Sequence, residues 1–95
     1  MSEESGLRVH LFIGGKVQGV GFRANACMIA RHIGVQGWIK NLADGRVEAV
    51  AEGAEGAVKK FAQWCHLGPQ YAEVTEVEIL WEEPTGQEQG FREQG

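Results

Sequence analysis

The chain opens with two stretches whose hydrophobic periods differ. Apolar residues occupy every second position from Leu7 to Ile13, and this alternation predicts a half-buried strand. From Phe22 onward the apolar positions recur at the spacing of one helical face, and Gly34 follows the last of them, where a C-terminal helix cap is expected. Residues 22–33 are therefore predicted to form an amphipathic helix.

The next two elements form a predicted hairpin. Residues 35–41 carry the apolar side chains of a second strand, and residues 46–52 alternate again as a third. Between them stands Asp44-Gly45, and an Asp-Gly pair flanked by strand-like segments is a strong signal of a hairpin turn. The third strand is therefore predicted to run antiparallel to the second.

A second helix and a fourth strand follow. Apolar residues at helical spacing predict a helix over residues 54–67, and the Gly-Pro pair after them ends it. Residues 73–82 are strand-like, but their apolar positions change phase between Val74 and Val77. A β-bulge, which inserts one extra residue into a strand, would absorb this change.

The order of these elements predicts the fold class. Strand, helix, strand, strand, helix, strand is the pattern of an α+β, ferredoxin-like β-α-β-β-α-β sandwich, in which an antiparallel sheet carries both helices on one face. A chain of this length is expected to be a single domain over residues 1–95, with its core in residues 7–83. Residues 1–6 and 84–95 are expected to be less ordered or peripheral, and the pattern leaves open whether residues 91–95 add a last strand.

Composition changes this picture mainly through glycine. Apolar residues make up 43% of the chain and charged residues 23%, as in ordinary globular domains. Glycine, by contrast, occurs 14 times, and four of these residues fall between positions 14 and 21. With only 2 prolines and no repeats, the excess indicates unusual backbone angles at specific places rather than a linker.

The lack of a recognisable targeting signal and the small number of cysteines favour a cytoplasmic location. No apolar run approaches the roughly 20 residues of a membrane span, and the acidic segment 1–6 is not a signal peptide. Cys27 and Cys65 are too few for a disulfide framework or a zinc site, and the three histidines lack ligand spacing. We therefore expect no metal, no cofactor and no membrane partner. Antiparallel helices would bring Cys27 and Cys65 together, which leaves a disulfide as the alternative to two buried thiols.

The net charge of −4 is unevenly distributed along the chain. Residues 1–46 contain six basic and three acidic side chains, whereas residues 47–95 contain three basic and ten acidic ones. A small anionic ligand is therefore expected near the first half, although glutamates that only solvate the second half would produce the same imbalance. No nucleic-acid partner is expected, because duplex binding usually requires a broad basic face.

A glycine-rich loop between the first strand and the first helix carries the candidate chemistry. Loop amides and the helix N-terminus converge there as hydrogen-bond donors, and the helix dipole favours an anion. Arg23 falls in the first helical turn, where its charge is unfavourable for the helix but its fork of donors suits phosphate oxygens. This combination predicts an anion site, and a tight turn beside a solvated arginine is the alternative.

Two segments resemble the signatures of the acylphosphatase family. Residues 15–23 are Gly-Lys-Val-Gln-Gly-Val-Gly-Phe-Arg, which is similar to the first signature. Residues 37–47, closing with Gly53, are similar to the second, with Ile39 where valine is commoner. The similarity covers nearly the whole predicted core. The tail departs more, because after Phe91 the family usually continues an apolar strand whereas this chain is polar.

The resemblance implies an enzyme that hydrolyses acyl phosphates to a carboxylate and inorganic phosphate without a metal. It implies that Arg23 binds the phosphoryl oxygens and that Asn41 orients the attacking water. The resemblance also implies that the phosphate is bound by the backbone amides of Lys16, Val17, Gln18, Gly19, Val20 and Gly21. Taken alone, Asn41 is typical of a strand end or an Asx-turn. If the first two strands are central neighbours, however, Asn41 lies near the loop.

A non-catalytic phosphate-binding or regulatory domain is the alternative function, because this fold also serves ligand-binding and RNA-binding domains. RNA binding is disfavoured, since the predicted third strand carries no aromatic residue. The expected partners are a small acyl phosphate and inorganic phosphate as product and inhibitor, with the protein a monomer. The absence of zinc-type cysteine motifs favours a stand-alone enzyme over a domain of a larger carbamoyl-transfer maturation protein.

Overall fold

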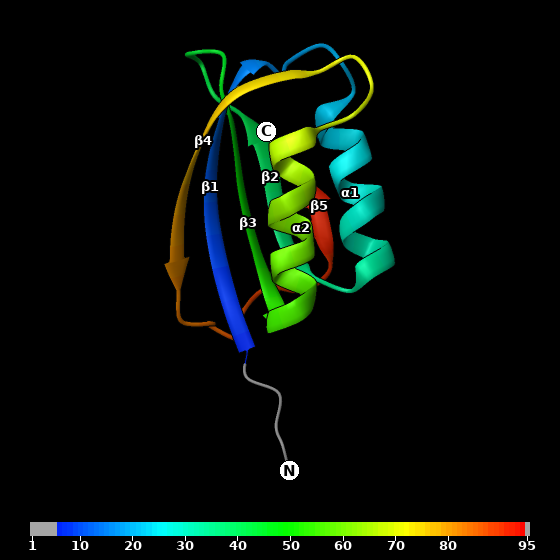
Figure 1. Cartoon of the computed structure of the whole chain (residues 1–95). Helices are drawn as coiled ribbons and strands as arrows, with labels where there is room; N and C mark the ends of the chain where they lie inside the picture. The colour runs from blue at the N-terminus through cyan, green and yellow to red at the C-terminus, as the bar shows by residue number, and fades with distance from the viewer. Residues whose placement is uncertain (1–5, 95) are drawn as a thin grey trace.

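A computed structural model describes residues 6–94 (Figure 1). The expected peripheral character of residues 1–5 and 95 falls outside these described residues. Across residues 6–94, no helix has both the length and the apolar character needed to cross a membrane. The elements are, in chain order, β1 (Gly6–Lys16), α1 (Phe22–Ile33), β2 (Gln36–Asn41), β3 (Val47–Ala54), α2 (Glu55–Leu67), β4 (Glu73–Glu82) and β5 (Phe91–Glu93).

The strands form one sheet in the order β4-β1-β3-β2-β5, and both helices cover the same face (Figure 1). The pairs β1–β4, β1–β3 and β2–β3 are all antiparallel, which confirms the ferredoxin-like α+β sandwich. The expectation that the first two strands are neighbours is wrong, because β3 lies between them. Since β1 and β2 are both antiparallel to β3, they run in the same direction and end at the same edge of the sheet.

The predicted bulge in β4 is present and lies at the end of β1. Gly14 pairs with Glu76 and Gly15 with Val74, so Thr75 is the extra residue in β4. It falls between Val74 and Val77, where the apolar phase changes in the sequence. The irregularity therefore lies immediately before the glycine-rich loop, at the edge where β1 and β2 end.

A fifth strand completes the sheet and makes it mixed rather than purely antiparallel. β5 pairs in parallel with β2, with Phe91 opposite Gly37 and Glu93 opposite Ile39. Phe91 is buried against Phe61, their ring centroids being 5.2 Å apart. The C-terminal segment therefore does form a last strand, in which a single buried aromatic residue anchors otherwise polar neighbours.

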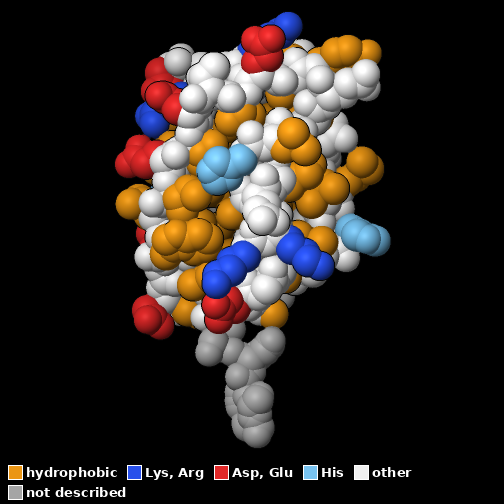
Figure 2. Space-filling view, in the orientation of Figure 1, with side chains coloured by type: hydrophobic (Ala, Val, Ile, Leu, Met, Phe, Trp, Pro, Cys, Tyr) orange, Lys and Arg blue, Asp and Glu red, His pale blue; other side chains and the backbone are white. Residues whose placement is uncertain are grey.

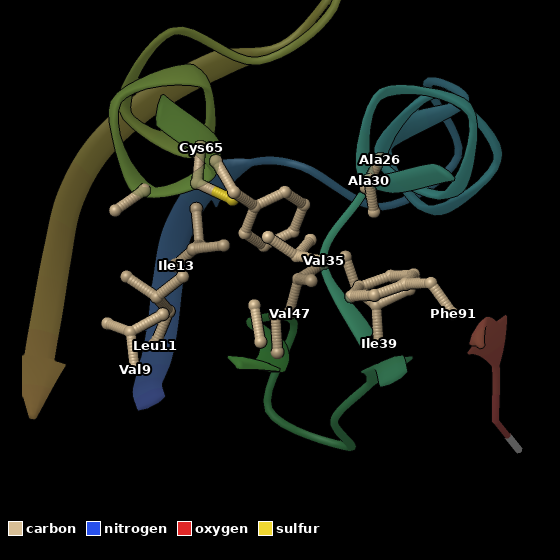
Figure 3. Close-up of a cluster of buried hydrophobic side chains, with 14 of the residues drawn as sticks. Val9, Leu11, Ile13, Ala26, Ala30, Val35, Ile39, Val47, Cys65 and Phe91 are labelled. Atoms are coloured by element: carbon tan, nitrogen blue, oxygen red, sulfur yellow. The ribbon is translucent and has the colours of Figure 1, made fainter. Parts of the chain in front are cut away.

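The core fills the space between the sheet and the two helices (Figure 3). Val9, Leu11 and Ile13 of β1 point into it on the side of α2 and Cys65, whereas Ala26 and Ala30 of α1 lie over β2 and β5. Burying each large aliphatic side chain of such a core contributes about 1.5–3 kcal/mol. The large side chains with less than 2% exposure include Phe22, Phe61, Leu11, Ile13 and Ile39.

Both cysteines are free and buried, so the structure shows two thiols rather than the alternative disulfide. Burial raises the pKa of Cys65 far above that of an exposed thiol. Burial also raises the pKa of Cys27, although the nearby Arg31 opposes that shift. Thiols held in this way stay protonated at neutral pH and are poor nucleophiles.

Acidic side chains follow the exposed edge formed by β4 (Figure 2). One buried acid, Glu52 on β3, has a structural task instead. Its carboxylate accepts hydrogen bonds from the Arg8 guanidinium at 2.9 Å and from the amides of Thr85 and Gly86 at 2.9 and 2.8 Å. Glu52 therefore ties the segment that leads from β4 to β5 onto the sheet.

The hydrogen bonds to Glu52 make a contribution to stability that depends on pH. Burial alone would raise the pKa of Glu52, but the hydrogen bonds from Thr85, Arg8 and Gly86 outweigh it and lower the pKa below the ordinary value of 4.5. The stabilisation is therefore complete above about pH 4.5 and is lost as the pH falls through the lower pKa of the folded state.

Replacing Glu52 with glutamine should lower the free energy of unfolding at pH 7 by about 1–3 kcal/mol, because donors that now meet the carboxylate lose an acceptor. Denaturant unfolding between pH 3 and pH 7 measures the effect. The Glu52→Gln protein should lose less stability on acidification than the wild type. Glu78→Gln, an exposed change of the same charge, is the control. Equal acid dependence of Glu52→Gln and the wild type would contradict this role.

Candidate active site

A pocket of about 140 Å³ lies at the edge where β1 and β2 end. This volume is below that of pockets for drug-sized ligands and suits a small chemical group. Three parts of the chain meet there: the loop after β1, the first turn of α1 and the end of β2. The lining residues are Val17, Gly19, Gly21, Phe22, Arg23, Ala24, Asn41 and Glu93.

The loop owes its shape to two glycines in the left-handed region. Gly19 has φ 75° and Gly21 has φ 78°, angles that residues with a Cβ rarely adopt. Gly21 is also the N-cap of α1, so no side chain caps the helix, and its first turn contains no acidic residue. The amides of that turn have no internal helical partners and are oriented to receive an anion.

Arg23 is positioned by the residue before it. Phe22 is 1% exposed and packs against Trp64, with ring centroids 5.3 Å apart, which fixes the start of α1 in the core. Arg23 comes next on the helix and lines the pocket with its side chain about one-third exposed. Its guanidinium is therefore available to a ligand at the helix N-terminus.

Asn41 lines the same pocket from a different element, as the last residue of β2. The alternative role, closing the hairpin turn, belongs to another residue. The Asp44 carboxylate accepts a hydrogen bond from the Arg46 amide at 3.0 Å and another from the Arg46 guanidinium at 2.9 Å. Asp44 thus shapes the turn, and Asn41 is exposed in the lining of the pocket.

The side chain of Gln18 joins the loop to this hairpin. Its amide nitrogen donates to the carbonyl oxygens of Leu42 at 2.8 Å and Arg46 at 2.9 Å. Leu42 directly follows Asn41, so the bridge links the segment that carries Arg23 to the segment that carries Asn41. Gln18 thereby fixes the distance across the pocket.

Methionine keeps the length of the Gln18 side chain but has no hydrogen-bond donor. Gln18→Met should therefore lower kcat about tenfold for the acyl phosphate hydrolysis that the sequence resemblance implies. The reason is geometric, since small displacements of groups on either side of a site reduce rates strongly. The free energy of unfolding should fall by about 1–2 kcal/mol because two hydrogen bonds are lost. Steady-state kinetics and thermal unfolding measure both, with the exposed Gln63→Met as control. An unchanged kcat would show that the bridge is irrelevant to catalysis.

Five of the eight residues predicted for the site line the pocket, namely Val17, Gly19, Gly21, Arg23 and Asn41. The other three take different positions: Lys16 is exposed at the end of β1 opposite Glu73, Gln18 forms the bridge, and Val20 packs against the core. Within residues 6–94, no three His, Cys, Asp or Glu side chains are grouped so that they could hold a metal ion.

Three lining residues were not predicted for the site, Phe22, Ala24 and Glu93, and Glu93 is the charged one among them. Its Oε1 lies 3.6 Å from Nη1 of Arg23. The only signal in the sequence was the polar character of the segment after Phe91, and that signal did not indicate where the segment lies.

Comparisons with known proteins identify the family of this chain. The sequence profile of the acylphosphatase family matches residues 9–93. The chain is 57% identical to an acylphosphatase of Roseiflexus sp. over 88% of this chain and 90% of the relative, and 54% identical to one of Thermococcus kodakarensis over 90% and 93%. The crystal structure of acylphosphatase from Bacillus subtilis superposes with a TM-score of 0.89 at 34% identity, covering 94% of this chain and 99% of that one.

Proposed function

The chain belongs to the acylphosphatase family and hydrolyses acyl phosphates, and we propose that it does so in the pocket formed by the glycine-rich loop, Arg23 and Asn41, without a metal. The observation that carries this proposal is the convergence of Arg23 and Asn41, which are 18 positions apart in sequence, on one small pocket at a helix N-terminus.

The phosphoryl group is bound by charge and by fixed donors. The Arg23 guanidinium pairs with two phosphoryl oxygens, and amides of the segment from Lys16 to Gly21 and of the first turn of α1 surround the others. These donors are held in position by the core contacts of Phe22 and by the left-handed glycines before it. Such preorganised donors stabilise the charge that develops on the oxygens in the transition state.

The leaving group explains why the pocket needs no general acid. Cleavage of the phosphorus–oxygen bond of an acyl phosphate releases a carboxylate, which is a weak base and departs without a proton. Phosphoryl transfer then depends mainly on alignment and on charge stabilisation. A pocket with one arginine, one asparagine and backbone amides meets both requirements.

Asn41 aligns the nucleophile. Its amide hydrogen-bonds a water molecule opposite the carboxylate leaving group, so that the water oxygen forms the new bond to phosphorus as the old bond breaks. A phosphoryl oxygen of the substrate takes the proton of that water. The products are one carboxylate and one dihydrogen phosphate, and phosphate competes with the substrate for the same donors. We further propose that the enzyme acts as a monomer in the cytoplasm.

Phosphate release from benzoyl phosphate tests the proposal. With the wild-type protein and excess EDTA, we expect the same rate as without the chelator and competitive inhibition by inorganic phosphate. A rate abolished by EDTA and restored by a divalent cation would refute the metal-free mechanism. Phosphate binding without any turnover would instead indicate the regulatory domain that the sequence left as an alternative.

A further inference from the structure

Glu93 is an acidic side chain in a pocket that we assign to an anion. It lines the pocket with Arg23 and Asn41, and its carboxylate lies 3.6 Å from the Arg23 guanidinium. A carboxylate and a phosphoryl oxygen are both anionic acceptors for the same guanidinium donors. Glu93 therefore occupies a position from which it competes with the ligand.

The backbone of Glu93 is held there by its strand. Arg31 donates two hydrogen bonds, at 3.0 and 2.8 Å, to the carbonyl oxygen of Phe91, whose side chain is buried. After Glu93, the amide of Gln94 donates to the carbonyl oxygen of Ile39 at 2.8 Å. The backbone of Glu93 is thus held between the anchored residues Phe91 and Gln94, at the end of β5 that points toward the site (Figure 1).

The ion pair itself is loose. Arg23 and Glu93 are 35% and 44% exposed, and their separation exceeds the length of a hydrogen bond. Arg8, on the inner strand β1, differs: its side chain is 14% exposed and meets three carboxylates at 2.9–3.2 Å. An ion pair as exposed as this one contributes little to stability. A better acceptor can therefore displace the Glu93 carboxylate from Arg23.

Resting on the proposed function, we propose that Glu93 is an internal competitor of the phosphoryl group. In the empty pocket its carboxylate neutralises Arg23. When a doubly charged phosphoryl group binds, Arg23 changes partner and the Glu93 side chain turns toward solvent. The negative charge that stays nearby weakens the binding of substrate and of product phosphate alike. Glu93 therefore sets the affinity of the pocket and promotes release of phosphate.

Glu93→Gln removes the charge and keeps the shape, so direct phosphate binding tests the proposal. In calorimetric titrations with inorganic phosphate, we expect Glu93→Gln to bind about three- to tenfold more tightly than the wild type. The matched control is Glu78→Gln, which makes the same change in net charge at an exposed position of β4. Its phosphate affinity should equal that of the wild type.

Kinetics separate competition from a structural role. For Glu93→Gln we expect the KM for benzoyl phosphate and the inhibition constant of phosphate to fall by the same factor. Unchanged or weaker phosphate binding, or a lower kcat with unchanged KM, would overturn the proposal and make Glu93 a support for Arg23. The titration needs no turnover. Tighter phosphate binding by a protein that does not hydrolyse benzoyl phosphate would therefore uphold this inference and refute the proposed function.

Discussion

The Arg23→Ala protein is expected to retain its fold and to lose about 10³- to 10⁵-fold in kcat/KM for acyl phosphates. Arg23 is the cationic side chain among the residues that line the pocket. In the proposed mechanism, its charge meets the oxygens on which negative charge collects. Its loss removes stabilisation that is greater in the transition state than in the ground state, so kcat should fall along with affinity. Steady-state hydrolysis of benzoyl phosphate measures both parameters.

A charge-matched pair sharpens this test. Arg23→Gln and Arg92→Gln make the same change, but Arg92 is exposed and pairs with Trp38 in the sheet, away from the pocket lining. Only the first should lose activity, and both should unfold at temperatures close to that of the wild type. Near-full activity of Arg23→Gln would remove the basis of the assignment.

The Asn41→Ala protein should show a kcat about 10²- to 10³-fold lower, the usual effect of losing one preorganised group at a reacting centre. Phosphate affinity should change less than about twofold, because in our account Asn41 holds the water and not the phosphoryl group. Steady-state kinetics combined with calorimetric phosphate titration separate the two effects. Equal losses of turnover and of phosphate affinity would make Asn41 a phosphate ligand.

The neighbouring turn supplies the comparison for Asn41. Asp44→Ala removes the carboxylate that caps the Arg46 amide, so it should lower the unfolding temperature while kcat stays near the wild-type value. Asn41→Ala should do the reverse. If Asn41→Ala instead destabilised the protein and spared kcat, the turn-forming role considered for Asn41 in the sequence would be the correct one.

The elements of this fold could be predicted because each has a strong local pattern. The helix predicted over residues 22–33 has the bounds of α1, and Gly34 caps it in the left-handed conformation with φ 88°. The bulge at Thr75 was also foreseeable, since a phase change in alternating residues requires an extra residue. Local periodicity thus carries the secondary structure.

Strand pairing and side-chain contacts between segments distant in sequence were harder to predict. The predicted adjacency of the first two strands was wrong because periodicity does not reveal which strands pair, and β3 separates them. The three residues of β5 are too short to show a period, and their pairing with β2 depends on the burial of Phe91. For that reason the position of Glu93 in the pocket could not be predicted. The Gln18 bridge is a side-chain contact across 24 positions and was equally hidden.

Hydrolysis in ¹⁸O-labelled water tests whether the pocket holds the phosphoryl group while water attacks phosphorus. After enzymatic hydrolysis of benzoyl phosphate, isotope shifts in ³¹P nuclear magnetic resonance and mass spectrometry of benzoate locate the label. We expect one ¹⁸O atom in each phosphate formed and none in benzoate. Label in benzoate would mean that water attacks the carbonyl carbon and would contradict the roles given to Arg23 and Asn41.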